Sequence, residues 1–110
     1  YMRQVQKAKR AECVGALMEL AQAMERDFSA NNQYRNIITA GLFSNACPID
    51  PGTTATYALT IPAATLTATS YELLATPSGT QASDVCGWLR LTSTGVKSSQ
   101  NLSINECWRR

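Results

Sequence analysis

The sequence predicts an α+β domain in which one long N-terminal helix packs on a four-stranded antiparallel sheet. Apolar residues recur every three or four positions up to residue 28, and they alternate at every second position from residue 53. The segments between the predicted strands are short, which favours antiparallel pairing. A helix followed by strands is the order typical of α+β layering. The 110 residues are enough for one domain with a modest core.

The helix is predicted over residues 3–28, where strong helix formers dominate and proline is absent. Its apolar stripe consists of Cys13, Leu17, Leu20, Met24 and Phe28. Projected backward, the same face carries Gln6 and Arg10. We therefore expect the stripe to pack on the sheet, while the first ten residues extend from the domain without a partner in this chain.

The start of this helix lacks the usual signal. No capping residue precedes Arg3, as expected for a helix that continues from an earlier segment. We expect about 25 mostly apolar residues before Tyr1, because a membrane-spanning helix needs about 20.

The remainder of the chain divides into a loop, a sheet and a tail. Residues 29–52 are rich in turn formers and predict a long loop. Alternating patterns at 55–61, 69–76 and 86–92, with a short segment at 96–98, predict four strands within residues 53–98. Residues 99–110 form a tail with little apolar content before Trp108.

The cysteines are Cys13, Cys47, Cys86 and Cys107. The chain has no histidine and no closely spaced cysteine pair, so zinc-type spacing is absent. An even count in a small domain favours two disulfides and an oxidising compartment, the alternative being four free thiols in a cytosolic protein. Four cysteines allow three connectivities, and the sequence alone does not choose among them.

We predict the pairing in which each bond closes a segment with few apolar residues of its own. A Cys86–Cys107 bond closes the tail in a loop of about 20 residues and stabilises it by roughly 3 kcal/mol. A Cys13–Cys47 bond then ties the long loop to the helix.

Three parts of the chain carry a family resemblance: residues 7–34 (KAKRAECVGALMEL and onward), residues 71–98 (YELLATPSGTQASDVCGWLRLT and onward) and the ending ECW. They resemble the type IV pilins, and among these the PilE-like minor pilins. The resemblance implies a ladle-shaped subunit with a long N-terminal helix, half buried in a filament. It also implies a four-stranded antiparallel sheet and a C-terminal loop bounded by a disulfide.

The function that this resemblance implies is that of a non-catalytic minor pilin that helps pilus assembly, adhesion or motility. Its partners would be other pilin subunits. A precursor with a methylated N-terminus would sit in the bacterial inner membrane, facing the periplasm, through an N-terminal helix missing here. The assembled protein would be part of the extracellular pilus, or fimbrium, while this fragment would be monomeric.

The basic run Lys7, Lys9 and Arg10 takes its interpretation from the same resemblance. These residues would lie just outside the membrane before assembly and between subunits afterwards. Basic groups near a bilayer gain about 1 kcal/mol each from anionic lipid. The alternative is an ordinary solvated helix face.

Nothing in the composition favours an enzyme. The commonest acid–base residue, histidine, is absent, and no glycine-rich phosphate loop occurs. The acidic residues that follow residue 26 are scattered over different elements: Asp27, Asp50, Glu72, Asp84 and Glu106. We expect no metal and no cofactor, and the lack of an acidic cluster in the tail argues against a calcium-binding pseudopilin.

Two alternative functions stay open. The first is a pilin-like subunit that binds DNA or another ligand in uptake, with contacts from Arg90, Lys97, Arg109 and Arg110. Four cations form a weak patch for binding driven by phosphate contacts, so nucleic acid is the less favoured partner. The second is a type II secretion pseudopilin. The sequon at residues 101–103 is interpreted as a chance match in a tail rich in asparagine and serine.

Overall fold

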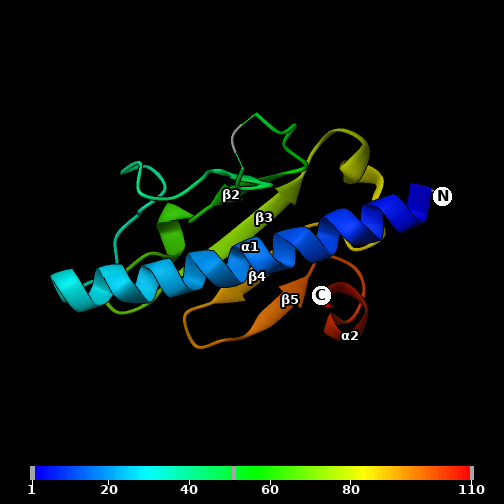
Figure 1. The fold of residues 1–110 in the computed structure, drawn as a ribbon. Coiled ribbons are helices and arrows are strands. Elements are labelled where there is room, and N and C mark those ends of the chain that lie inside the picture. Colours follow the sequence, from blue (N-terminus) through cyan, green and yellow to red (C-terminus); the bar gives the residue numbers. More distant parts are fainter. Residues whose placement is uncertain (1, 51, 110) are drawn as a thin grey trace.

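The first helix, α1 (Met2–Asn31), runs along the length of the molecule (Figure 1). The computed structural model describes residues 2–50 and 52–109. α1 continues beyond its predicted end at residue 28 and stops where Asn32 adopts a left-handed conformation, with φ of 58°. The Asn32 N–H donates to the Phe28 carbonyl oxygen at 2.7 Å, which closes the last turn. Asparagine tolerates this backbone conformation better than most residues do.

The sheet contains five strands in the order β1-β2-β3-β4-β5, and all neighbouring strands are antiparallel. Their bounds are Ala46–Cys47 for β1, Tyr57–Thr60 for β2, Glu72–Pro77 for β3, Leu89–Thr92 for β4 and Lys97–Ser99 for β5. Two short 3-10 helices, η1 (Ala63–Thr65) and η2 (Gly79–Ser83), lie in the connections. The short helix α2 (Ile104–Cys107) lies in the tail.

The count of four predicted strands is wrong by one. β1 lies inside the predicted loop and pairs with β2 through Ala46 opposite Ala58 and Cys47 opposite Tyr57. A strand of two residues has no alternation that a sequence pattern could show. The third predicted strand also starts too early. Gly87 has φ of 68°, which is incompatible with an extended strand, and β4 begins only at Leu89.

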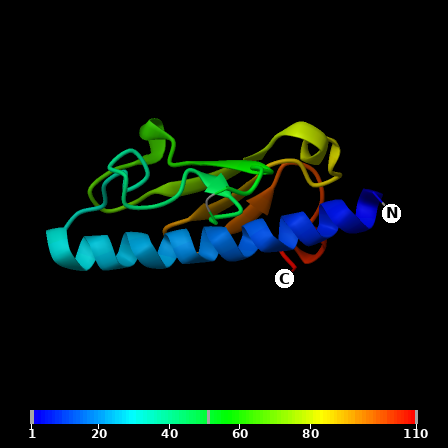
Figure 2. The same ribbon diagram turned by 45° about the horizontal axis from the view of Figure 1, so that its top comes forward.

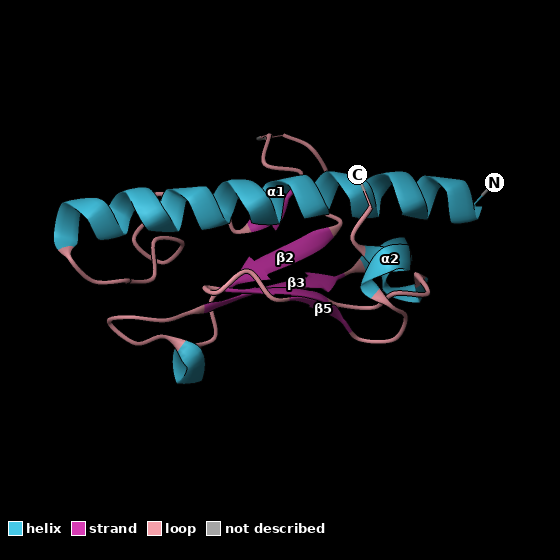
Figure 3. Cartoon of the chain, turned by 90° about the horizontal axis from the view of Figure 1, so that it is seen from below, coloured by secondary structure: helices cyan, strands magenta, loops and turns pink. Residues whose placement is uncertain are grey.

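The core lies between α1 and one face of the sheet, which form two layers (Figures 2 and 3). Its largest fully buried side chains include Leu17, Leu20 and Met24 from α1 and Leu73 and Leu89 from the sheet. Burial of each such side chain stabilises the fold by about 1.5–3 kcal/mol. Phe28, the last residue of the predicted stripe, is only partly buried and packs on Tyr34 with ring centroids 4.6 Å apart.

Two disulfides attach the loop and the tail to this core. Cys13 bonds to Cys47, with Cα atoms 5.5 Å apart, and Cys86 bonds to Cys107, with Cα atoms 5.8 Å apart. This pairing confirms the prediction that each bond closes a segment with few apolar residues of its own. The first bond holds β1 to α1, and the second holds α2 beside β5 (Figure 3). None of the helices in the described part of the chain has the length and apolar character that crossing a bilayer requires.

Candidate functional site

The C-terminal loop ends in an aromatic anchor. Trp108 follows α2 and is 8% exposed, and its Nε1–H donates to the Ser98 carbonyl oxygen of β5 at 2.9 Å. Together with the Cys86–Cys107 bond, this hydrogen bond fixes α2 to the sheet. The tail is thus an ordered part of the surface although it contains few apolar residues.

A cationic hollow lies beside this anchor. Its volume is ≈ 500 Å³, and it is lined by Lys97, Ile104, Asn105, Trp108 and Arg109. The Lys97 Nζ lies 5.8 Å from the centroid of the Trp108 ring, close enough for a cation–π contact. Arg109 is exposed at the same hollow. Two cations that line one hollow form a surface that attracts phosphate or carboxylate groups.

Arg90 belongs to a different surface. Because Arg90 is opposite Ser98 in the β4–β5 register, it points to the face of the sheet opposite to that of Lys97. Its Nε donates to Ser98 Oγ at 3.1 Å, and its Nη1 lies 3.6 Å from a Glu72 carboxylate oxygen. Its guanidinium lies 5.2 Å from the Trp88 ring centroid.

The four predicted DNA-contact residues therefore do not form one patch. Lys97 and Arg109 share a hollow, whereas Arg90 lies on the other face of the sheet. Arg110 lies outside the described residues. Alternation along β4 could have separated Arg90 from the core-facing positions, but the β4–β5 register that places Lys97 is not encoded in a local pattern.

The basic run on α1 is also divided, because Arg10 is not exposed as Lys7 is. Lys7 is exposed and Lys9 partly buried, but Arg10 is buried and its Nη1 donates to both carboxylate oxygens of Asp84 at 2.6 and 2.8 Å. Arg10 is therefore committed within this chain. Its charge is balanced by Asp84 in the folded chain.

The expectation that the first ten residues lack a partner is wrong for the same reason. Gln6 is 5% exposed, and its Nε2 donates to the Thr80 carbonyl oxygen at 2.9 Å and to Ser83 Oγ at 2.8 Å. The stripe does continue backward through Gln6 and Arg10, and η2 and Asp84 supply polar partners to that part of the face. The sequence does place the polar residues Gln6 and Arg10 at the helical spacing of the buried stripe, which could have indicated their burial. Their partners, however, are far away in sequence.

Sequence reasoning missed the buried Gln81 that completes this contact. Its Nε2 donates to the Gln6 carbonyl oxygen and to Tyr57 Oη, both at 2.9 Å, while its Oε1 has no partner among the described residues. Burial raises the pKa of Tyr57 to about 12, so its hydroxyl stays protonated in this setting. We refer to Gln6, Arg10, Gln81 and Asp84 as the polar seam.

Three aromatic rings, one of phenylalanine and two of tyrosine, pack at the C-terminal end of α1. Tyr34 packs on Phe28 and on Tyr71, with ring centroids 4.6 and 4.8 Å apart. Glu25 accepts hydrogen bonds from Tyr34 Oη at 2.8 Å and from Tyr71 Oη at 3.4 Å. Burial is the main cause that raises the pKa of both tyrosines, and the neighbouring Glu25 carboxylate is the next largest cause. The rings join the end of α1 to β3.

No arrangement typical of a metal centre occurs among residues 2–50 and 52–109, because no three metal-ligating side chains come together there. All four cysteines are in disulfides and do not supply thiolates.

The fold and sequence are similar to those of known filament proteins. The profile of the family described as "Type IV minor pilin ComP, DNA uptake sequence receptor" matches residues 1–90. A type IV pilin from Shewanella oneidensis has a similar structure, with a TM-score of 0.65 and 25% identity over 96% of this chain and 99% of that chain. The Neisseria meningitidis non-core minor pilin PilV has a TM-score of 0.64 and 15% identity over 92% of each chain. A comparison with curated proteins gave no match.

Proposed function

This chain belongs to the family of type IV minor pilins, and from that premise we propose that it packs against other pilin subunits through the exposed face of α1. A minor pilin is a structural subunit, and pilins are normally non-catalytic. The observation that carries the proposal is the two-sided character of α1. Leu17 and Leu20 are buried against the sheet, whereas Glu12, Gln22 and Arg26 lie exposed on the other side.

The location follows from the same role. The chain would reside at the inner membrane before assembly and in the extracellular pilus afterwards. Within the filament it would contribute to assembly, adhesion or motility.

The test is incorporation of the protein into pili in its own bacterial host. An epitope-tagged chromosomal copy should co-purify with pili sheared from the cells. The control is a strain without the assembly ATPase, in which the tagged protein should stay with the cells. A tagged protein that remains entirely in the cell fraction while pili are produced would reject the proposal.

Contact with DNA is a second candidate function, favoured by the cationic hollow at Lys97 and Arg109. The matched family is described as a DNA uptake sequence receptor, but both residues lie beyond residue 90, where the match ends. The contact must therefore be tested on this chain's own residues. Trp108 is mostly buried, so its ring would position Lys97 beside a phosphate and would not stack on a base.

A titration of duplex DNA at several salt concentrations tests this candidate. Replacing Lys97 and Arg109 by glutamine should weaken binding and reduce the slope of log affinity against log salt by about 0.9 for each phosphate that the variant no longer neutralises. Arg90→Gln is the matched control, because Arg90 lies on the other face and is paired with Glu72. Absence of binding by the unmodified protein at low salt would eliminate this function.

A further inference from the structure

A hollow of ≈ 330 Å³ lies between the C-terminal half of α1 and the turn that joins β4 to β5. It is lined by Ala21, Gln22, Glu25, Tyr71, Leu91, Thr92, Ser93 and Gly95. Ala21 and Glu25 are four residues apart, so they lie on the same side of the helix. The hollow is therefore built by one helical face, the ring that precedes β3 and the β4–β5 turn.

The wall of this hollow is apolar, and its rim contains one carboxylate. Tyr71 and Leu91 are buried core residues that form the wall. Glu25 is exposed and is the only charged residue among the described lining residues. None of the three ion pairs in the described part of the chain includes Glu25. Its negative charge is thus not balanced by a cation of this chain.

Two tyrosine hydroxyls hold the Glu25 carboxylate in place. Tyr34 Oη lies 3.0 Å from Oε1 and 2.8 Å from Oε2, and Tyr71 Oη lies 3.4 Å from Oε2. Hydrogen bonds to a carboxylate are stronger than those between neutral groups, and they fix its orientation. A fixed carboxylate above an apolar wall suits a cation that has an aliphatic stem.

We propose that this hollow binds the side chain of a lysine from another protein. The four methylene groups of the lysine pack against Tyr71 and Leu91, and its ammonium group donates to Glu25. The Tyr71 ring adds a cation–π attraction. This site goes beyond the filament role proposed above, because a single chain in solution is sufficient for it.

The hydrogen bonds at Glu25 favour lysine over arginine. Arginine pairs best with a carboxylate through two parallel N–H···O bonds, which require both oxygens. Both oxygens of Glu25 already accept from Tyr34. The lysine ammonium group is a compact charge and needs only one remaining lone pair, and a carboxylate offers about four.

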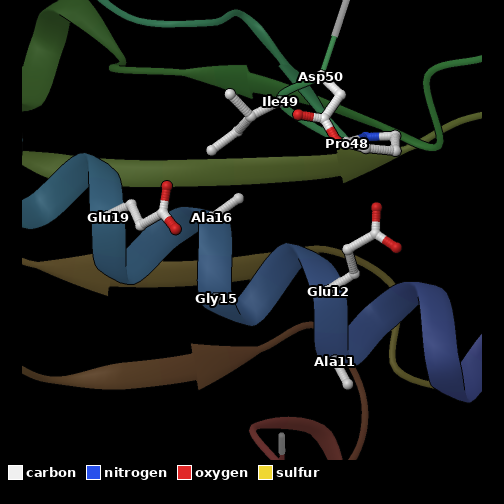
Figure 4. A pocket seen from close by; sticks show the side chains of 8 residues that line it. All are labelled: Ala11, Glu12, Gly15, Ala16, Glu19, Pro48, Ile49 and Asp50. Carbon is white, nitrogen blue, oxygen red and sulfur yellow. The ribbon is translucent and has the colours of Figure 1, made fainter. Parts of the chain in front are cut away.

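A second hollow beside α1 provides an internal comparison. Its volume is ≈ 390 Å³, and it lies between α1 and the segment that follows β1. Figure 4 shows the carboxylates of Glu12 and Glu19 on α1 and that of Asp50 on the segment opposite. None of its described lining residues is aromatic. This hollow attracts any small cation by charge, and salt weakens such an attraction.

An NMR titration of the purified, oxidised chain with Nα-acetyl-lysine N-methylamide tests the proposal. The backbone amide signals of Gln22, Glu25 and residues 91–95 should shift and saturate. The norleucine derivative has the aliphatic stem without the ammonium group, and it should bind about fivefold more weakly, as expected for loss of one exposed ion pair. The arginine derivative should also bind more weakly than the lysine derivative.

Butylamine tests whether a free amine is the better ligand. It has the ammonium group and the stem but lacks the peptide groups of the lysine derivative. It should bind no more tightly than that derivative. Tighter binding of butylamine would overturn the assignment to a lysine of a protein.

Three variants localise the binding. Glu25→Gln should weaken binding of the lysine derivative about fivefold and leave the norleucine derivative unaffected, while the glutamine oxygen still accepts from the tyrosines. Glu19→Gln removes the same charge from the comparison hollow of Figure 4 and should leave binding unchanged. Tyr34→Phe frees lone pairs on both oxygens and should strengthen binding of the arginine derivative.

Four outcomes would overturn the proposal. They are the absence of saturable shifts around Glu25, shifts confined to Glu12 and Glu19, equal affinity for the lysine and norleucine derivatives, and unchanged affinity in Glu25→Gln. An arginine derivative that binds the unmodified chain as tightly as the lysine derivative would overturn the choice of lysine.

Discussion

Asp84→Ala removes the acceptor of the buried ion pair in the polar seam. The side chains of Arg10 and Asp84 are only 9% and 3% exposed, and Arg10 Nη1 lies 2.6 and 2.8 Å from the two carboxylate oxygens. Without the carboxylate, the Arg10 guanidinium stays buried without a counter-charge. Loss of one partner from a buried pair typically costs about 3–5 kcal/mol.

That cost is large compared with a typical total stability of about 5–15 kcal/mol. A loss of about 4 kcal/mol lowers the midpoint of thermal unfolding by roughly 15–30 °C for a domain of this size. The double replacement Arg10→Met/Asp84→Leu should recover most of the loss, because two apolar side chains leave no unpaired charge and avoid the desolvation of both ions.

Thermal and urea unfolding of the oxidised protein, followed by circular dichroism, would measure these differences in stability. Glu72→Ala is the control. It breaks the exposed pair with Arg90, whose atoms are 3.6 Å apart, and should cost less than about 1 kcal/mol. An Asp84→Ala protein as stable as the unmodified one, or a double variant no better than the single, would refute the assignment of a buried, tightly coupled pair.

Two further predictions concern the tail and the buried tyrosine. Replacing Cys86 and Cys107 by alanine, which opens a loop with a sequence separation of 21, should cost roughly 3 kcal/mol. Hydrogen exchange should then lose protection in residues 99–109 before β2, and equal loss in both would contradict the prediction. Burial raises the pKa of Tyr57 from 10.0 to about 12. The contribution of its neutral hydroxyl to the free energy of unfolding is therefore complete below pH 10 and is lost as the pH rises toward 12. Two pKa units correspond to about 3 kcal/mol. Measured by urea unfolding, the free energy of unfolding should decrease less between pH 9 and pH 11.5 in Tyr57→Phe than in the unmodified protein. An equal decrease in the two proteins would contradict this assignment.

The layers of the fold were predictable because each has a strong internal period. Leu17, Leu20 and Met24 repeat at helical spacing, and Leu73 and Ala75 repeat at strand spacing, and the structure buries all five. β1 and α2 were not predictable in the same way. They contain two and four residues, which is too few for a period, and they are held by disulfides and by contacts with β2 and β5.

The polar seam shows why the site was harder to predict than the fold. The helical period places Gln6 and Arg10 on the face of the stripe, but their polarity suggests exposure to solvent. Their partners lie about 74 residues away, at Thr80 and Asp84, and local patterns carry no information about contacts at that separation. A polar side chain at a buried position requires a polar partner, so the spacing of Gln6 and Arg10 was itself a signal that such partners exist.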